Sequence, residues 1–227
     1  MNRYRFQFLL AALFALILAL PFQHFLGNWG HYATSLLFFL MLLAAVAAVA
    51  QKRVTGVMTL GLFTASIVLK IIGVWYLPDP ILMADYIVTT LFMGTVIMLI
   101  LGGIFNHGHV TLNTICAALS VYLLLAVVWA MLYGLVDLIE PGSFAYNTTI
   151  GGDDPSMQFG GGRSVIPLYF SLVTLTTLGY GDIVPVSPAA SMLAVVEAVI
   201  GQFYLTVLVA WLVGMYISDS IKPKANQ

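Results

Sequence analysis

The chain has 227 residues, of which 61% are hydrophobic and 7% are charged, and its formal net charge is −1. A soluble domain carries charge on roughly a quarter of its residues, so this composition excludes an ordinary soluble protein. The small net charge leaves no basic surface of the kind that binds nucleic acid. The single cysteine, Cys116, lies in an apolar run and is interpreted as a small packed side chain.

Apolar runs of about 20 residues, long enough to cross a bilayer, recur along the chain. Because backbone polar groups need partners inside a membrane, we expect each run to be a helix. The first run follows Met1-Asn-Arg-Tyr-Arg5, a basic start typical of signal peptides, but it is too long for one and no cleavage site follows, so a retained helix is favoured. Six crossings are predicted, at residues 6–26, 31–50, 55–76, 81–104, 112–138 and 189–217.

A different segment separates the fifth run from the sixth. It is polar and glycine-rich over residues 140–163, and a short amphiphilic stretch over residues 165–176 follows. That stretch is too short to span a bilayer and is predicted to be a re-entrant helix. The expected fold is therefore an all-α membrane protein with six transmembrane helices, and a re-entrant helix and loop between the fifth and sixth.

The basic residues predict the orientation of the chain. With six crossings, one side of the membrane receives Arg3, Arg5, Lys52, Arg53, Lys222 and Lys224, and the other receives Arg163. By the positive-inside rule, both termini are predicted to be cytoplasmic, in a multi-pass protein of the cell (plasma or inner) membrane.

The run at residues 174–182, Thr-Leu-Thr-Thr-Leu-Gly-Tyr-Gly-Asp, ends the predicted re-entrant helix. Irregular backbone is tolerated at this depth where it lines a pore. The five residues Thr177, Leu178, Gly179, Tyr180 and Gly181 resemble the potassium-channel signature usually written TVGYG, with leucine at the valine position. The resemblance implies a tetrameric pore-loop potassium channel, of a six-transmembrane, prokaryotic-like kind.

The chemistry of such a segment follows from its residue types. A potassium ion in a narrow pore exchanges its hydration shell for protein oxygens, which stacked carbonyls and a threonine hydroxyl supply from four chains. Gly179 and Gly181 allow the backbone conformations that aim successive carbonyls at one axis. Potassium is therefore expected at Thr177, Leu178, Gly179 and Tyr180, as the permeant ion, with no cofactor.

The resemblance extends over residues 112–217 and implies roles for further residues. Thr176 supports the filter, and Tyr169 and Phe170 match the aromatic pair of the pore helix. Tyr169 is expected to reach Asp182 at the outer end of the filter. Some bacterial relatives carry a pore-helix glutamate at the position of Val173, so an inactivation mechanism that depends on that carboxyl is not expected here.

The sixth run carries a candidate hinge and a candidate constriction. Gly201 lies where the family has its hinge glycine, and both bending and close helix packing account for a glycine there. Below it, Val209, Val213 and Ile217 share one helix face. If that face lines the axis it forms a hydrophobic constriction, and otherwise it contacts lipid or other helices.

Lys70, Asp85 and Glu197 are the candidate buried charges within the apolar runs. Lys70 is interpreted as pairing with Asp85 or snorkelling outward, with a functional intramembrane charge as the alternative. Glu197 either lies behind the filter, bonded to pore-helix groups, or faces the cavity.

His107 and His109, in the connection before the fifth run, are interpreted as solvated loop residues, with a pH switch as the alternative.

Two domains are predicted. Residues 1–105 form a four-helix bundle in the position of a voltage sensor, and residues 106–227 form the pore domain, with outer helix, pore helix, filter and inner helix. The fourth run contains no arginine or lysine for a field to move, so opening is predicted to depend only weakly on voltage.

The predicted function is passive, potassium-selective conduction by a homotetramer in the lipid bilayer, without enzymatic chemistry. A potassium uptake transporter would need four pore loops in one chain, whereas this sequence holds one. A non-conducting subunit that modifies another channel is the second alternative. A poorly selective cation channel would be expected to replace Tyr180 or Gly181.

Overall fold

The chain is mainly α-helical in the computed structural model, which describes residues 4–19, 28–49, 53–75, 79–106, 111–146 and 166–221. The helices are α1 (Arg5–Ala19), α3 (Asn28–Val49), α4 (Arg53–Trp75), α5 (Asp79–Asn106), α6 (Leu112–Ile139), α7 (Ile166–Leu175) and α8 (Pro188–Ile221), and the two short strands are β1 (Phe144–Tyr146) and β2 (Ile183–Pro185). Their bounds lie within a few residues of the predicted runs wherever both are described. His107, His109 and residues 147–165 lie outside the described residues.

Within the described residues, four helices are long and apolar enough to cross a membrane: α3, α5, α6 and α8. The helices α1 and α4 carry shorter apolar stretches, Arg5–Ala19 and Gly56–Ile72, and α7 is shorter still. These helices indicate a multi-pass membrane protein of the all-α class.

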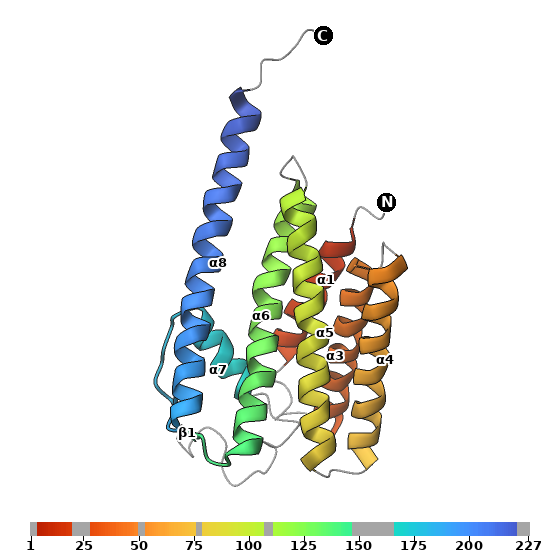
Figure 1. Cartoon of the computed structure of the whole chain (residues 1–227), viewed down its shortest axis with the longest axis vertical. Helices are drawn as coiled ribbons and strands as arrows, with labels where there is room; N and C mark the ends of the chain where they lie inside the picture. The colour runs from red at the N-terminus through yellow and green to blue at the C-terminus, as the bar shows by residue number, and fades with distance from the viewer. Residues whose placement is uncertain are drawn as a thin grey trace.

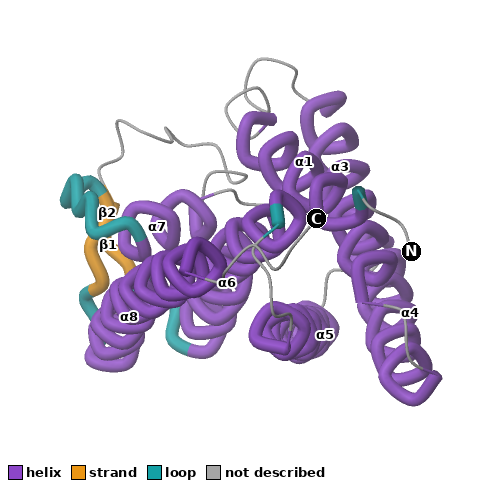
Figure 2. Tube along the Cα trace, turned by 90° about the horizontal axis from the view of Figure 1, so that it is seen from above, coloured by secondary structure: helices purple, strands orange, loops and turns teal. Residues whose placement is uncertain are grey.

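The long helices run in alternating directions, so the start of α1 and the end of α8 point the same way (Figure 1). Seen from above, α6 lies between α8 on one side and the group of α1, α3, α4 and α5 on the other (Figure 2). Contacts follow this order, since α6 packs against α1, α5, α7 and α8. The short helix α7 contacts both α6 and α8. The helix α6 therefore connects the first four described helices to the segment that carries the candidate site.

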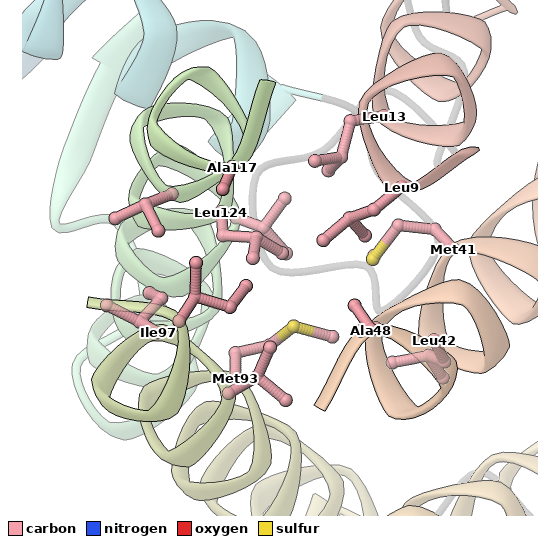
Figure 3. Packing of buried hydrophobic residues seen from close by; sticks show 14 of the residues in the cluster. Leu9, Leu13, Met41, Leu42, Ala48, Met93, Ile97, Ala117 and Leu124 are labelled. Atoms are coloured by element: carbon pink, nitrogen blue, oxygen red, sulfur yellow. The ribbon is translucent and has the colours of Figure 1, made fainter. Parts of the chain in front are cut away.

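One hydrophobic cluster fills the space where α1, α3, α5 and α6 converge (Figure 3). Leu9 and Leu13 of α1 meet Met41 of α3, Met93 of α5 and Leu124 of α6 there, and all five side chains are fully buried. Lipid tails are as apolar as these side chains, so close packing and not water exclusion holds the helices together. Partly buried residues of α7 and α8 border the same cluster.

We expect the loss of packing in this cluster to destabilise the protein measurably. Leu42→Ala removes a fully buried side chain from α3, whereas Leu36→Ala removes the same atoms from a site on α3 that is 59% exposed. The first change should lower the free energy of unfolding by about 2–5 kcal/mol, and the second by much less. Unfolding of both variants in detergent micelles measures the difference, and equal losses would contradict the assignment of this core.

Candidate functional site

The segment of the predicted filter, Thr177–Gly181, begins two residues after the end of α7. The helix itself is well packed, and its buried residues include Phe170, Ser171 and Leu175. The six residues 176–181 that follow are all exposed in the single chain, with Leu178 at 54% and Tyr180 at 66%. A buried helix thus presents an exposed, glycine-containing loop.

The backbone of this segment alternates in handedness. The φ angles of Thr177, Gly179 and Gly181 are +56°, +58° and +75°. Glycine adopts such angles without penalty, whereas a non-glycine residue pays roughly 1–2 kcal/mol. Thr177 is the non-glycine residue with positive φ in the described part of the chain. The sequence predicted unusual backbone conformations at Gly179 and Gly181, but it did not predict the positive φ angle of Thr177.

Hydrogen bonds fix which way the peptide groups of the segment face. The amide of Thr177 donates to the carbonyl of Thr174 at 2.9 Å, and the amides of Leu178 and Gly179 donate to the carbonyl of Val173 at 2.9 and 3.4 Å. In a trans peptide the carbonyl points opposite to the amide of the next residue. The carbonyls of residues 176, 177 and 178 therefore point away from α7, toward the exposed side.

The outer end of the segment is held by a side-chain bond and a small sheet. The hydroxyl of Tyr169 donates to Oδ2 of Asp182 at 2.6 Å, which is the contact expected from the sequence. Directly after it, β2 pairs antiparallel with β1, and the carbonyl of Ser143 accepts a bond of 2.8 Å from the amide of Val186. These links tie the end of α6 to the chain that leaves the filter segment.

The two aromatic residues of the predicted pair on α7, Tyr169 and Phe170, contact different parts of the structure. Tyr169 reaches Asp182, whereas Phe170 lies in a buried cluster with Tyr133 and Phe144, at ring centroid distances of 4.9 and 5.4 Å. Both pairs meet edge to face, an arrangement that favours fixed ring positions. Phe170 thereby anchors α7 to α6 and to β1.

Glu197 lies behind the filter segment, which decides between the two interpretations left open by the sequence. It is fully buried, and its two carboxyl oxygens accept bonds from different helices. The hydroxyl of Ser171 on α7 donates to Oε1 at 2.5 Å, and the hydroxyl of Tyr133 on α6 donates to Oε2. Three helices therefore meet at one carboxyl group.

Gly201 is a point of close helix packing. A Cβ at this position would lie 2.7 Å from the carbonyl oxygen of Leu175, the last residue of α7. The same oxygen accepts a bond of 3.1 Å from the hydroxyl of Tyr122 on α6. The helix α8 continues through Gly201 to Ile221, and bending there remains a prediction. Val209, Val213 and Ile217 are exposed in this chain, as a surface lining an axis would be.

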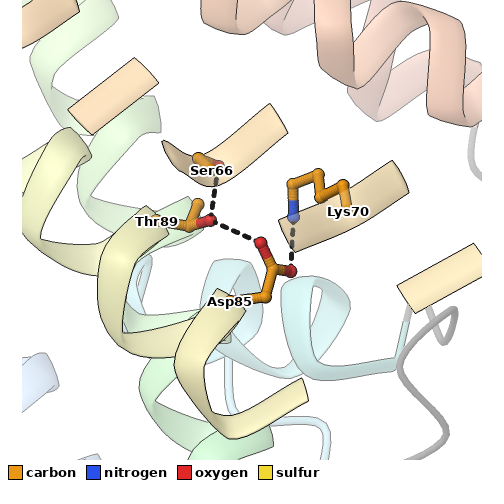
Figure 4. Close-up of polar contacts among 4 residues, drawn as sticks. All are labelled: Ser66, Lys70, Asp85 and Thr89. Carbon is orange, nitrogen blue, oxygen red and sulfur yellow. Dashed lines mark hydrogen bonds and ion pairs between the residues drawn. The ribbon is translucent and has the colours of Figure 1, made fainter. Parts of the chain in front are cut away.

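Lys70 and Asp85 form the predicted ion pair. The Nζ atom of Lys70 lies 2.6 Å from Oδ2 of Asp85, and the side chains are 31% and 12% exposed. Thr89 donates to the other carboxylate oxygen at 3.2 Å and is in turn bonded to Ser66 at 2.9 Å (Figure 4). The ammonium group also lies 4.9 Å from the centre of the Phe38 ring on α3. The pair joins α4 to α5 and α3.

Several residues of this region were not singled out from the sequence, namely Ser171, Tyr133, Tyr122 and Tyr204. The hydroxyl of Tyr204 on α8 donates to the carbonyl of Ala118 on α6 at 2.6 Å, and its ring stacks on Tyr122 with centroids 5.8 Å apart. Tyrosines and serines within apolar runs were the available signal, because a hydroxyl in a membrane seeks a partner.

Comparisons with known proteins agree with this geometry. A family model described as "Ion channel" matches residues 86–218, which is more than half of the chain and runs from α5 to the end of α8. It thus covers the whole candidate site except for Lys70 and Asp85. The matching family is one of ion channels and not of enzymes.

Curated plant proteins are similar to shorter stretches of the chain. It is 42% identical over 52 residues to two pore potassium channel c of Oryza sativa subsp. japonica, 50% identical over 46 residues to two pore potassium channel b of the same plant, and 42% identical over 52 residues to two-pore potassium channel 5 of Arabidopsis thaliana. These matches cover 23%, 18% and 23% of this chain and 11%, 13% and 12% of the relatives. No solved structure matches the chain significantly.

We expect Gly201 and Gly214, both on α8, to respond oppositely to alanine. Gly201→Ala forces a Cβ against a backbone oxygen, and backbone cannot yield as a side chain end does, so thermal stability should fall. Nothing lies within 4 Å of a Cβ at Gly214, and alanine there should gain up to about 1 kcal/mol of helix propensity. Equal shifts in the two melting temperatures would contradict close packing at Gly201.

The Lys70–Asp85 pair should be structural. Lys70→Met leaves a largely buried carboxylate without its cation, which should lower the free energy of unfolding by about 1–3 kcal/mol. Adding Asp85→Asn removes the uncompensated charge and should restore much of that loss. Unfolding of the single and double variants forms a mutant cycle, and independent, additive losses would contradict the pairing.

Proposed function

The chain belongs to the ion channel family, and we propose that it is the subunit of a potassium-selective channel. The proposal rests on the segment Thr177–Gly181, which joins a potassium-channel signature to a backbone of alternating handedness. Its amides are bonded back to α7 and its carbonyls face the exposed side. A row of such carbonyls is what replaces the hydration shell of a potassium ion. The names of the plant relatives support the choice of potassium.

We propose a homotetramer with the pore on its four-fold axis. One chain supplies one filter segment, so carbonyl rings need four copies around an axis. The exposed apolar face of α8 and the exposed filter segment support this, since both would be buried by neighbouring copies. In this assembly α7 is the re-entrant pore helix. Its C-terminal end, with negative partial charge, faces the cavity below the filter and stabilises a cation there.

We further propose six crossings per subunit, with both termini in the cytoplasm. The alternating directions of α1, α3, α4, α5, α6 and α8 support this count, because the first and last of them point the same way (Figure 1). The segment between α6 and α7 then faces outward, next to the outer end of the filter.

Gating in this proposal depends only weakly on voltage. The helix α5, in the place of a sensor helix, has no arginine or lysine, and Lys70 of α4 is paired with Asp85 within the bundle. The constriction at Val209, Val213 and Ile217 closes by dewetting if these residues line the axis. Conduction is passive and needs no cofactor.

Flux through reconstituted liposomes tests the selectivity. The wild-type protein should pass potassium and exclude sodium, with little dependence on the applied voltage. Gly179→Ala places a side chain at a φ of +58° within the filter, and it should abolish selective flux. Gly142→Ala introduces the same kind of strain at a φ of +84° in the turn after α6, and it should leave selectivity unchanged.

Two results would contradict the proposal. Equal sodium and potassium flux through the wild-type protein would exclude a selective filter. Absence of flux from the chain alone, together with altered currents beside a second channel protein, would favour the non-conducting modifying subunit.

A further inference from the structure

We propose that Glu197 is a positioning residue of the filter, which fixes the pore helix α7 at one depth between α6 and α8. This inference rests on the proposed function, because it assigns Glu197 a role in potassium binding. Glu197 itself does not contact the filter segment through any hydrogen bond among the described residues. Its effect reaches the filter through α7.

The contact between α7 and α8 repeats over one helical turn. Glu197 of α8 meets Ser171 of α7, and four residues further along each helix, Gly201 meets Leu175. Because Glu197 and Gly201 are four residues apart, they share one face of α8, and Ser171 and Leu175 share one face of α7 for the same reason. The first contact is a hydrogen bond of 2.5 Å, and the second is close packing against a backbone oxygen. Together they align the two helices at two heights.

The hydrogen bonds of the Glu197 carboxyl group fix the position of α7 along α8, which close packing alone does not do. Apolar helices in lipid can slide past one another at small cost, whereas a directional bond holds one height. The Ser171 hydroxyl of α7 and the Tyr133 hydroxyl of α6 each bond to a different oxygen of Glu197. The carboxyl group is fully buried, so the loss of either bond leaves a buried polar atom without that partner.

The pore helix transmits this register to the filter over a few residues. Ser171 lies two positions before Val173, whose carbonyl accepts the amides of Leu178 and Gly179. Any tilt or shift of α7 moves that carbonyl, and the peptide groups bonded to it turn with it. The ion-coordinating carbonyls of Thr177 and Leu178 are the opposite ends of those peptide groups. Glu197 thus orients the potassium-coordinating groups without contacting the ion. A group that hydrogen-bonds to a metal ligand acts on the metal site in the same way.

The role predicts graded effects of substitution. Glu197→Leu removes both bonds, and Ser171→Ala removes the one to α7. Glu197→Gln keeps the shape and the polar atoms, and a hydroxyl can accept from the new amide, so both links survive. Ser66→Ala is the matched control, because Ser66 is also fully buried and bonded to a side-chain oxygen, but lies on α4.

The experiment measures potassium binding by the assembled protein in detergent. Melting temperatures are recorded over a series of potassium concentrations at constant ionic strength, with sodium as the balancing ion, because a ligand that binds the folded state raises its stability by RT ln(1 + c/Kd), where c is the free ligand concentration. The second measurement is the potassium-to-sodium permeability ratio of the same variants in liposomes. Size-exclusion chromatography establishes that each variant keeps the wild-type oligomeric state.

We expect Glu197→Leu to weaken potassium binding by about 10–100-fold, in the range seen for outer partners of metal ligands. Ser171→Ala should show a smaller loss in the same direction, with a lower permeability ratio. Glu197→Gln should bind potassium as the wild type does. Ser66→Ala should lower the melting temperature in sodium but leave the potassium response unchanged.

The outcomes separate the inference from the function on which it rests. A wild-type protein without any potassium response overturns the proposed function. A wild-type response that Ser171→Ala and Glu197→Leu both retain in full overturns the positioning role alone. If Glu197→Leu fails to assemble, Ser171→Ala and Tyr133→Phe decide, because each leaves the carboxyl with one partner. A loss in Ser66→Ala equal to that in Ser171→Ala also overturns the role.

Discussion

The carbonyl oxygen of Val173 holds two consecutive peptide groups of the candidate filter. It accepts hydrogen bonds from the amides of Leu178 and Gly179. The nitrogens of both peptide groups therefore point toward α7, and their carbonyl oxygens point toward the exposed side. Unpaired carbonyls in a membrane protein are costly unless an ion or water meets them. The bonds to Val173 therefore impose a cost that an ion would relieve in the proposed channel. The positive φ angles of Thr177 and Gly179 are the backbone consequence.

A carbonyl on a short helix can impose such a geometry only if the helix itself is fixed. The helix α7 is held on several sides, by the Phe170 ring cluster, by Glu197 and by the close contact of Gly201 with Leu175. Tyr122 binds the final carbonyl of the helix from α6. These contacts come from α6 and α8, and the family match includes the contacting residues of both helices.

The sequence was sufficient for features that depend on local pattern and for pairs that lie near each other along the chain. Apolar runs located the helices, and the glycines of the signature located the unusual backbone. The contact of Lys70 with Asp85 followed from a short separation and matching chemistry, and that of Tyr169 with Asp182 was implied by the resemblance to the potassium-channel family. For Glu197 the sequence offered pore-helix groups as one alternative but did not single out Ser171, and it gave no sign of Tyr133, which lies 64 positions away. Likewise, no propensity predicts a threonine with positive φ.

The first four described helices are predicted to take the place of a voltage sensor, but their chemistry favours a fixed position. A sensor helix must carry several cations and must slide, so its ion pairs have to exchange partners. Lys70 instead sits in one site, held by Asp85 and by the ring of Phe38, while Thr89 donates to the carboxylate and is itself bonded to Ser66. The core that joins α1, α3 and α5 to α6 is continuous with the packing around the pore helix. In the proposed channel, a bundle built in this way would support α6 as the outer helix of the pore, and a stimulus that opens the channel would act elsewhere or deform bundle and pore together.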